Sequence, residues 1–157
     1  MTRRTFNAVV KSYVGIYEVT DKVIVGHFFK SARNTWITRT SPLFSSKYAW
    51  CAAFIYTMLK KAGKAPKYME AQHTIRAKSY IPVSMGGLLK ADAVKLPEAE
   101  EGDIIVLKRG KNMYHVGTFV SANSKTIMVR GGNQSNKVKN SLYRIEALVS
   151  IANYESI

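Results

Sequence analysis

The spacing of apolar residues changes along the chain from helical to alternating, which predicts a helical first part and a β-rich second part. Residues 3–14 carry apolar side chains at helical spacing, and Gly15 ends that segment. Residues 21–31 are apolar and fit a helix or a strand, and we interpret them as a helix. Residues 32–47 are rich in polar residues and contain Pro42, which predicts a long loop.

The clearest predicted helix follows that loop. Its apolar face is formed by Cys51, Phe54, Ile55, Met58 and Leu59. Ser45 or Ser46 is suited to cap its start, and Gly63 to end it. We expect a further helix over residues 68–80, before the Gly86–Gly87 pair.

After Pro97 the pattern becomes that of β-strands. Residues 104–107, 115–121 and 126–130 are short apolar runs separated by turn residues, and residues 137–154 leave room for two or three more strands. Helices followed by an antiparallel sheet predict an α+β fold. The chain has 157 residues and lacks repeats and linkers, so we expect residues 1–157 to form a single domain.

The charge of the chain is unusual. It carries 24 Lys and Arg against 10 Asp and Glu, a formal net charge of +14, and residues 1–80 hold 14 of the basic and 3 of the acidic side chains. This excess indicates an anionic partner such as a nucleic acid, a membrane surface or an anionic polymer. The alternative is a solvated basic surface that only keeps the protein soluble.

The N-terminus carries an Arg-Arg pair, but its pattern is not typical of a twin-arginine export signal. Lys11, Glu18 and Asp21 interrupt the apolar run that a signal peptide needs. No stretch approaches the roughly 18 apolar residues of a membrane span. We therefore expect a protein made in the cytoplasm without a signal peptide or transmembrane segment.

Cys51 is the only cysteine, which rules out an internal disulfide. Its predicted place in the first turn of a helix favours the thiolate, the nucleophilic form. The alternative is a small buried apolar residue, because Cys51 also lies on the apolar face of that helix.

A thiolate nucleophile requires a base, and the chain has three histidines. His27 lies in an apolar run and is expected to be a core or edge residue. His73 lies on a charged segment and is expected at the surface. His115 opens an apolar strand, where it can face a helix packed against the sheet. We therefore favour His115.

A third polar group usually orients such a base. Asn133 or Gln134 follows the next predicted strand and is suited to this role, although Gly131–Asn133 also fits a simple turn. Residues 108–111 are a solvated loop or part of an anion-binding rim, and Asp103 is expected to cap a turn. No cluster has the spacing of a zinc or calcium site, so we expect no metal or cofactor.

Six short blocks resemble, in order, those of the cysteine, histidine-dependent amidohydrolase/peptidase (CHAP) and NlpC-like peptidoglycan hydrolases. They are Y-V-G-I-Y-E at 13–18, W-C-A-A-F at 50–54, R-A-K-S-Y at 76–80, G-D-I-I-V at 102–106, H-V-G at 115–117 and G-G-N-Q-S at 131–135. The resemblance covers nearly the whole chain and is closest to compact one-domain phage members. Ala49 and Tyr114 depart from the family pattern, where Pro and Gly are common.

The resemblance implies a papain-like fold with Cys51 as nucleophile, His115 as base and Asn133 as the orienting residue. It also implies oxyanion donors in the backbone N–H of Cys51 and an upstream polar neighbour such as Tyr48. We further predict Trp50, Tyr114 and Gln134 as substrate-binding residues.

The predicted activity is amide hydrolysis in peptidoglycan, either as an N-acetylmuramoyl-L-alanine amidase or as a stem or cross-bridge endopeptidase. We expect a monomer drawn to the anionic cell envelope by its charge. A phage endolysin released through a holin is the favoured context, ahead of a secreted antibacterial effector. The alternative function is a basic nucleic-acid-binding protein with a structural cysteine, although no nucleic-acid motif is present.

Overall fold

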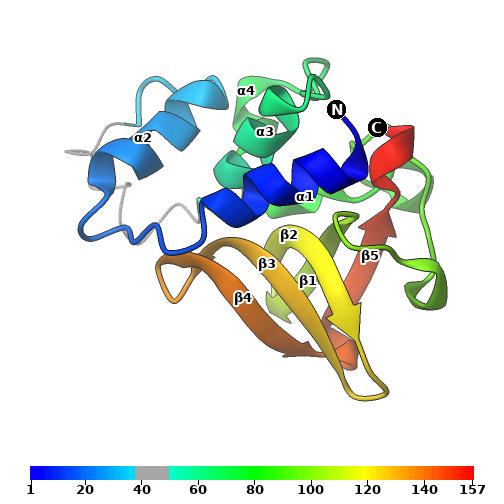
Figure 1. The fold of residues 1–157 in the computed structure, drawn as a ribbon. Coiled ribbons are helices and arrows are strands. Elements are labelled where there is room, and N and C mark those ends of the chain that lie inside the picture. The colour runs from blue at the N-terminus through cyan, green and yellow to red at the C-terminus, as the bar shows by residue number, and fades with distance from the viewer. Residues whose placement is uncertain (38–49) are drawn as a thin grey trace.

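The computed structural model describes residues 1–37 and 50–157. Four α-helices precede a five-stranded sheet (Figure 1). The helices are α1 (Arg3–Ser12), α2 (Lys22–Ser31), α3 (Cys51–Lys61) and α4 (Ala71–Thr74). The strands are β1 (Ile104–Gly110), β2 (Met113–Ala122), β3 (Thr126–Gln134), β4 (Lys137–Arg144) and β5 (Leu148–Ala152).

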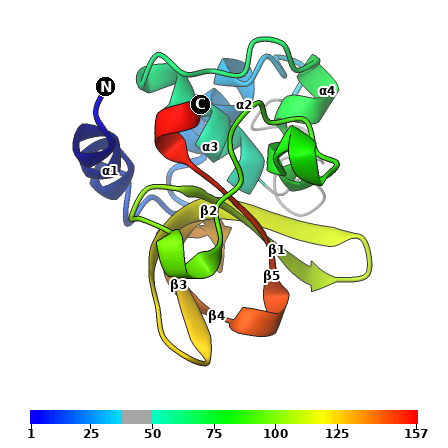
Figure 2. The same ribbon diagram turned by 90° about the vertical axis from the view of Figure 1, so that its right-hand side faces the viewer.

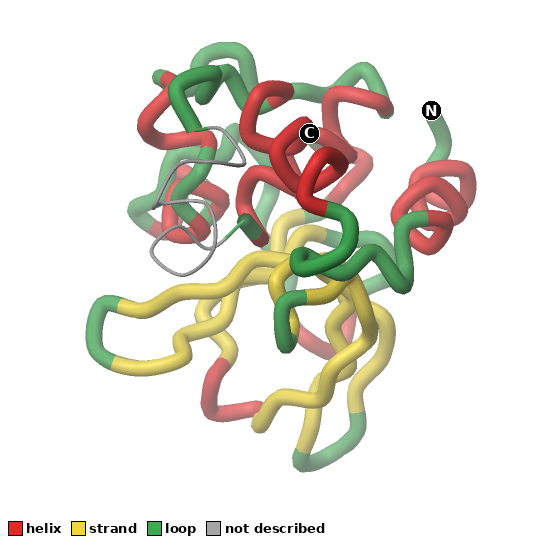
Figure 3. The backbone as a smooth tube through the Cα atoms, turned by 90° about the vertical axis from the view of Figure 1, so that its left-hand side faces the viewer, coloured by secondary structure: helices red, strands yellow, loops and turns green. Residues whose placement is uncertain are grey.

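The strands form an antiparallel sheet in the order β4-β3-β2-β1-β5. The helices gather on one side of it, as two perpendicular views show (Figures 1 and 2). Figure 3 shows the same separation of helices from strands. The predicted α+β class is therefore confirmed, and residues 137–154 supply two strands.

Helices α1 and α2 form where the apolar pattern predicts them. In α1, Phe6 and Val10 are buried, and the Thr2 side chain caps the start by accepting a hydrogen bond from the Thr5 N–H at 3.2 Å. The run at 21–31 is confirmed as a helix, which buries Val25 and Phe28.

Helix α3 is the centre of the helical layer. All residues from Cys51 to Leu59 are buried, so this helix is enclosed on every side rather than on one face. It ends at Lys61, and Gly63 terminates it as predicted. Gly63 has a φ of +75°, and the N–H of Lys64 returns to the carbonyl of Leu59 at 2.8 Å. The predicted caps Ser45 and Ser46 lie outside the described residues.

The prediction of one helix over residues 68–80 is wrong. The segment forms the single turn α4 and a separate 3₁₀ turn, η1 (Ala77–Tyr80). Other side chains bind the carbonyls that a longer helix would use. Asn34 donates to the Ala71 carbonyl at 2.9 Å, and the Tyr80 hydroxyl donates to the Thr74 carbonyl at 2.8 Å.

The sheet has an apolar core on each face. The helix-side core packs α1, α2 and α3 against residues such as Val106, Val116 and Val138. The outer-face core contains Ile105, Leu107, Phe119, Ile127, Val129 and Ile151. Within the two described ranges, no helix has the length and apolar character needed to cross a membrane.

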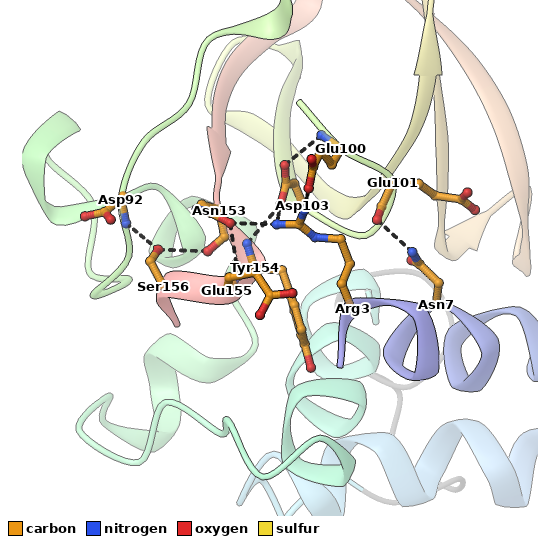
Figure 4. Close-up of polar contacts among 10 residues, drawn as sticks. All are labelled: Arg3, Asn7, Asp92, Glu100, Glu101, Asp103, Asn153, Tyr154, Glu155 and Ser156. Atoms are coloured by element: carbon orange, nitrogen blue, oxygen red, sulfur yellow. Dashed lines mark hydrogen bonds and ion pairs between the residues drawn. The ribbon is translucent and has the colours of Figure 1, made fainter. Parts of the chain in front are cut away.

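A partly buried polar network joins the two ends of the chain (Figure 4). Arg3 donates to Asp103 at 3.0 Å and to Asn153 at 2.7 Å. Asp103 also accepts hydrogen bonds from the N–H groups of Tyr154 and Glu100, both at 2.9 Å. The second bond confirms Asp103 as a turn cap, and the network fixes α1 to the start of β1.

Candidate active site

Cys51 is the first residue of α3, and its side chain is buried against β2. Three backbone groups lower the pKa of its thiol: the N–H of Val116 in β2 and those of Cys51 and Ala52 at the helix start. Burial acts more strongly, so the pKa of the thiol is raised overall. The groups at the helix start therefore favour the thiolate as expected, but burial outweighs them, so the thiol is neutral in this buried state.

His115 lies near the start of β2 and is 1% exposed. It pairs with Leu107 of β1 and stacks on Tyr143 of β4, with ring centroids 5.7 Å apart. Burial lowers the pKa of the imidazole to about 4, with a smaller contribution from the positive charge of Arg109. His115 is thus neutral near pH 7, as a general base must be.

Gln134, at the end of β3, holds the imidazole. Its Oε1 lies 3.1 Å from Nε2 of His115 and accepts a hydrogen bond from the Tyr143 hydroxyl at 2.8 Å. Its Nε2 donates to the carbonyls of Val129 and Lys139, which fixes the orientation of the amide. Because an amide oxygen only accepts, Nε2 of His115 carries the proton and Nδ1 is left as the basic nitrogen.

Asn133 does not orient His115, contrary to what the resemblance implies. The register of β3 against β4 shifts between Gly131 and Gln134, and Asn133 lies in this bulge with a φ of +56° and its side chain partly exposed. The bulge brings Gln134 back into the interior in its place. The segment is also part of a strand, so the simple-turn interpretation is wrong.

The close packing of β3 on the start of α3 depends on Gly132. A Cβ on Gly132 would lie 2.6 Å from the Trp50 ring, whereas one on Gly131 would lie 3.5 Å from Nε2 of His115, an ordinary contact. The absence of a side chain at Gly132 therefore lets β3 approach the start of α3.

Cys51 and His115 reach β2 from opposite sides. The thiol belongs to the helix-side core, whereas the imidazole shares the other face of the sheet with Leu107 and Tyr143. Among the described strand pairs, β2 and β3 pair only from Thr118 and Arg130 onward. The Cys51 thiol accepts a hydrogen bond from the N–H of Val116, the residue after His115. Val116 lies outside the part of β2 that pairs with β3.

The other two histidines lie elsewhere. His27 lies on α2 with its side chain exposed, so the expectation that it is a core or edge residue is wrong. His73 lies partly exposed in α4, close to the predicted surface position. His115 is the only buried one of the three.

Two predicted substrate-binding residues have different surroundings. Trp50 is fully buried and stacks on Phe28, with centroids 5.9 Å apart, which corrects the expectation that its ring contacts substrate. Tyr114 is partly buried, with Nζ of Lys78 5.7 Å from its ring centroid. Tyr48 lies outside the described residues.

Sequence reasoning missed Tyr143, which touches both His115 and Gln134. Its pKa is raised to about 12 by burial, so its hydroxyl keeps the proton that it donates to Gln134. No motif marks this residue, and only the position of β4 beside β3 brings it to the site.

No candidate metal centre accompanies these residues. In residues 1–37 and 50–157, no three His, Cys, Asp or Glu side chains gather as potential metal ligands. A cavity of about 650 Å³ lies beside α2, lined in part by Val23, Phe28 and Lys61, and it does not include Cys51, His115 or Gln134.

Comparisons with protein-family models, with curated proteins and with solved structures find no match for the chain. Its function is therefore inferred from its own residues and their arrangement.

Proposed function

We propose that the protein is a cysteine-dependent peptidoglycan hydrolase of the CHAP and NlpC-like type, with a papain-like fold, Cys51 as nucleophile and His115 as base. One observation carries this proposal: Gln134 accepts a hydrogen bond from Nε2 of His115, which leaves Nδ1 of His115 free to act as a base. The next residue, Val116, donates its backbone N–H to the Cys51 thiol.

The sequence blocks add independent support. W-C-A-A-F, H-V-G and G-G-N-Q-S supply the thiol, the imidazole and the orienting amide, and they lie far apart in the sequence. All three lie at the same end of β2 and β3, with the thiol and the imidazole on opposite faces of the sheet. The net charge of +14 favours binding to an anionic wall, most strongly at low ionic strength.

The first half of the reaction begins from the neutral thiol and the neutral imidazole. In the proposed reaction the Cys51 proton passes to Nδ1 of His115 through a bridging water at the end of the β2–β3 pairing, as the sulfur attacks the carbonyl carbon of the scissile amide and a C–S bond forms. The N–H groups at the start of α3 are free of helical partners and are suited to stabilise the oxyanion. The imidazolium then gives its proton to the leaving amine as the C–N bond breaks.

The second half restores the enzyme. Water attacks the thioester carbonyl while His115 again accepts a proton, and the C–S bond breaks to release the carboxylic acid. The proton returns to the sulfur of Cys51. Throughout, Gln134 keeps the imidazole in position and accepts a hydrogen bond from its Nε2–H in both protonation states.

The proposed setting is a one-domain phage endolysin that acts as a monomer. It reaches the wall through a holin. A secreted antibacterial effector would use the same chemistry.

The test is mass spectrometry of fragments released from purified, outer-membrane-stripped cell walls by the wild type and by Cys51→Ala. The proposal expects fragments with a new amine from the wild type alone, and their masses identify an amidase or an endopeptidase. No fragments from several wall chemistries, together with salt-sensitive nucleic-acid binding that survives Cys51→Ala, would replace the proposal with the nucleic-acid-binding alternative.

A further inference from the structure

Arg109 lies beside the candidate active site without belonging to it. It is in β1, two residues beyond Leu107, the strand partner of His115. The register of β1 and β2 shifts between Lys108 and Gly110, which leaves Arg109 as the unpaired residue of a bulge. Bulges of this kind redirect a side chain and are common next to active sites.

The guanidinium of Arg109 is exposed and has no carboxylate of its own. In residues 1–37 and 50–157, the ion pairs of arginines involve Arg3 and Arg130, and no hydrogen bond of the Arg109 side chain is present. Lys108 and Lys111, which flank it, are also exposed. The bulge therefore presents positive charge without a neutralising partner.

The positive charge of Arg109 acts electrostatically on the groups of the candidate active site. It lowers the pKa values of the Cys51 thiol, the His115 imidazole and the Tyr143 hydroxyl, so it lies near all three. A substrate bound at Cys51 and His115 is consequently within the range of this cation.

We propose that Arg109 binds a carboxylate of the substrate close to the scissile amide, so that the preferred substrates are peptides with a free carboxylate beside the cleaved bond. This inference rests on the proposed hydrolase function and adds its substrate class. An arginine suits the role because its planar guanidinium binds a carboxylate through two parallel hydrogen bonds. Peptide stems in which that carboxylate is amidated lose this pairing and become poorer substrates.

The experiment compares two synthetic wall peptides that differ only in a free or an amidated carboxyl group next to the scissile bond. Wild type, Arg109→Ala and Arg109→Lys are assayed on both, with Lys125→Ala as the control. Lys125 is equally exposed but lies in the turn between β2 and β3, which Figure 1 shows at the end of the sheet away from the helices.

The inference expects Arg109→Ala to lower kcat/KM on the carboxylate peptide by roughly tenfold or more, mainly through KM, and to change kcat/KM on the amidated peptide by a clearly smaller factor, which reflects only the lost field of Arg109 on Cys51 and His115. Arg109→Lys should retain part of the preference, and Lys125→Ala all of it. Equal losses on both peptides would mean that Arg109 acts only through its field on Cys51 and His115, and would overturn the inference.

Two other outcomes separate this inference from the proposed function. If the wild type cleaves both peptides equally and Arg109→Ala changes neither rate, the hydrolase function stands and the inference fails. If the wild type cleaves neither peptide and releases nothing from intact walls, the function fails and the inference falls with it.

Discussion

The amide oxygen of Gln134 lies 3.1 Å from Nε2 of His115 and fixes which imidazole nitrogen carries the proton. Gln134 is itself fixed, because it accepts a hydrogen bond from Tyr143 and donates to backbone carbonyls of β3 and β4. The base of the proposed reaction is therefore oriented by one side chain at the end of β3.

Replacing Gln134 should impair turnover far more than replacing Asn133. Gln134→Ala leaves the Nε2–H of His115 without an acceptor and frees the ring to rotate. A buried hydrogen bond of this kind is worth about 1–3 kcal/mol, so kcat should fall on the order of 10- to 100-fold. The measurement is the initial rate of wall solubilisation, with thermal unfolding as a check on folding.

Asn133→Gly is the matched control. It removes the neighbouring side chain while glycine accepts the φ of +56° without strain. Its rate should stay within about threefold of the wild type. The reverse ranking of the two variants would assign the orienting role to Asn133 instead.

His115 should make the fold less stable in acid. The folded-state pKa is about 4 and the ordinary value is 6.5, so the unfolded chain binds the proton more tightly. The free energy of unfolding should therefore decrease as the pH falls from above 6.5 toward 4. The expected contribution of His115 is about 3 kcal/mol.

This loss is measured by denaturant unfolding of the wild type and His115→Gln at pH 7 and pH 4.5. Glu18 and Asp103, whose pKa values are raised by burial, act in the opposite direction but are present in both proteins. The difference between the two slopes isolates His115. His27→Gln, at an exposed position, should keep the wild-type slope. Equal slopes for wild type and His115→Gln would show that the imidazole is not buried in its neutral form.

Gly132→Ala should destabilise the protein. The added methyl group would lie 2.6 Å from the Trp50 ring and 3.0 Å from Cβ of Phe54, so the start of α3 or the β3 bulge must shift. Overpacking of this kind costs about 1–3 kcal/mol.

Gly110→Ala provides the comparison, because its nearest neighbour is Sδ of Met113 at 3.6 Å, an ordinary contact. Its unfolding free energy should change by no more than about 0.5 kcal/mol. Chemical denaturation of both variants checks the prediction, and similar stabilities would contradict the close packing of β3 on α3.

The apolar pattern predicts most of the fold because the elements concerned bury a regular face or alternate across the sheet. Helices α1, α2 and α3 and strands β1, β2 and β3 follow it, and β4 and β5 lie within residues 137–154, where it left room for two or three strands. The pattern fails at residues 68–80, where Asn34 and Tyr80 compete for the carbonyls of the helix. Such tertiary contacts leave no trace in local spacing.

The site was predicted in part. The sequence points to Cys51, His115 and the segment that holds Gln134, but not to which of its two amides faces the imidazole. That choice depends on the β3 bulge, which reverses the alternation of side chains. The raised pKa of Cys51 also escaped prediction, because burial depends on how α3 packs between the sheet and the other helices.

The most direct test of the proposed function is the loss of turbidity of purified, outer-membrane-stripped cell walls with wild type and Cys51→Ala at equal concentration. The substitution removes only the sulfur at a buried position, and thermal unfolding verifies that the variant is folded. The account predicts rapid clearing by the wild type and a rate at least about 10³-fold lower for Cys51→Ala. Equal clearing by both proteins would contradict the assignment of Cys51 as nucleophile, and no clearing by either would contradict the hydrolase function itself.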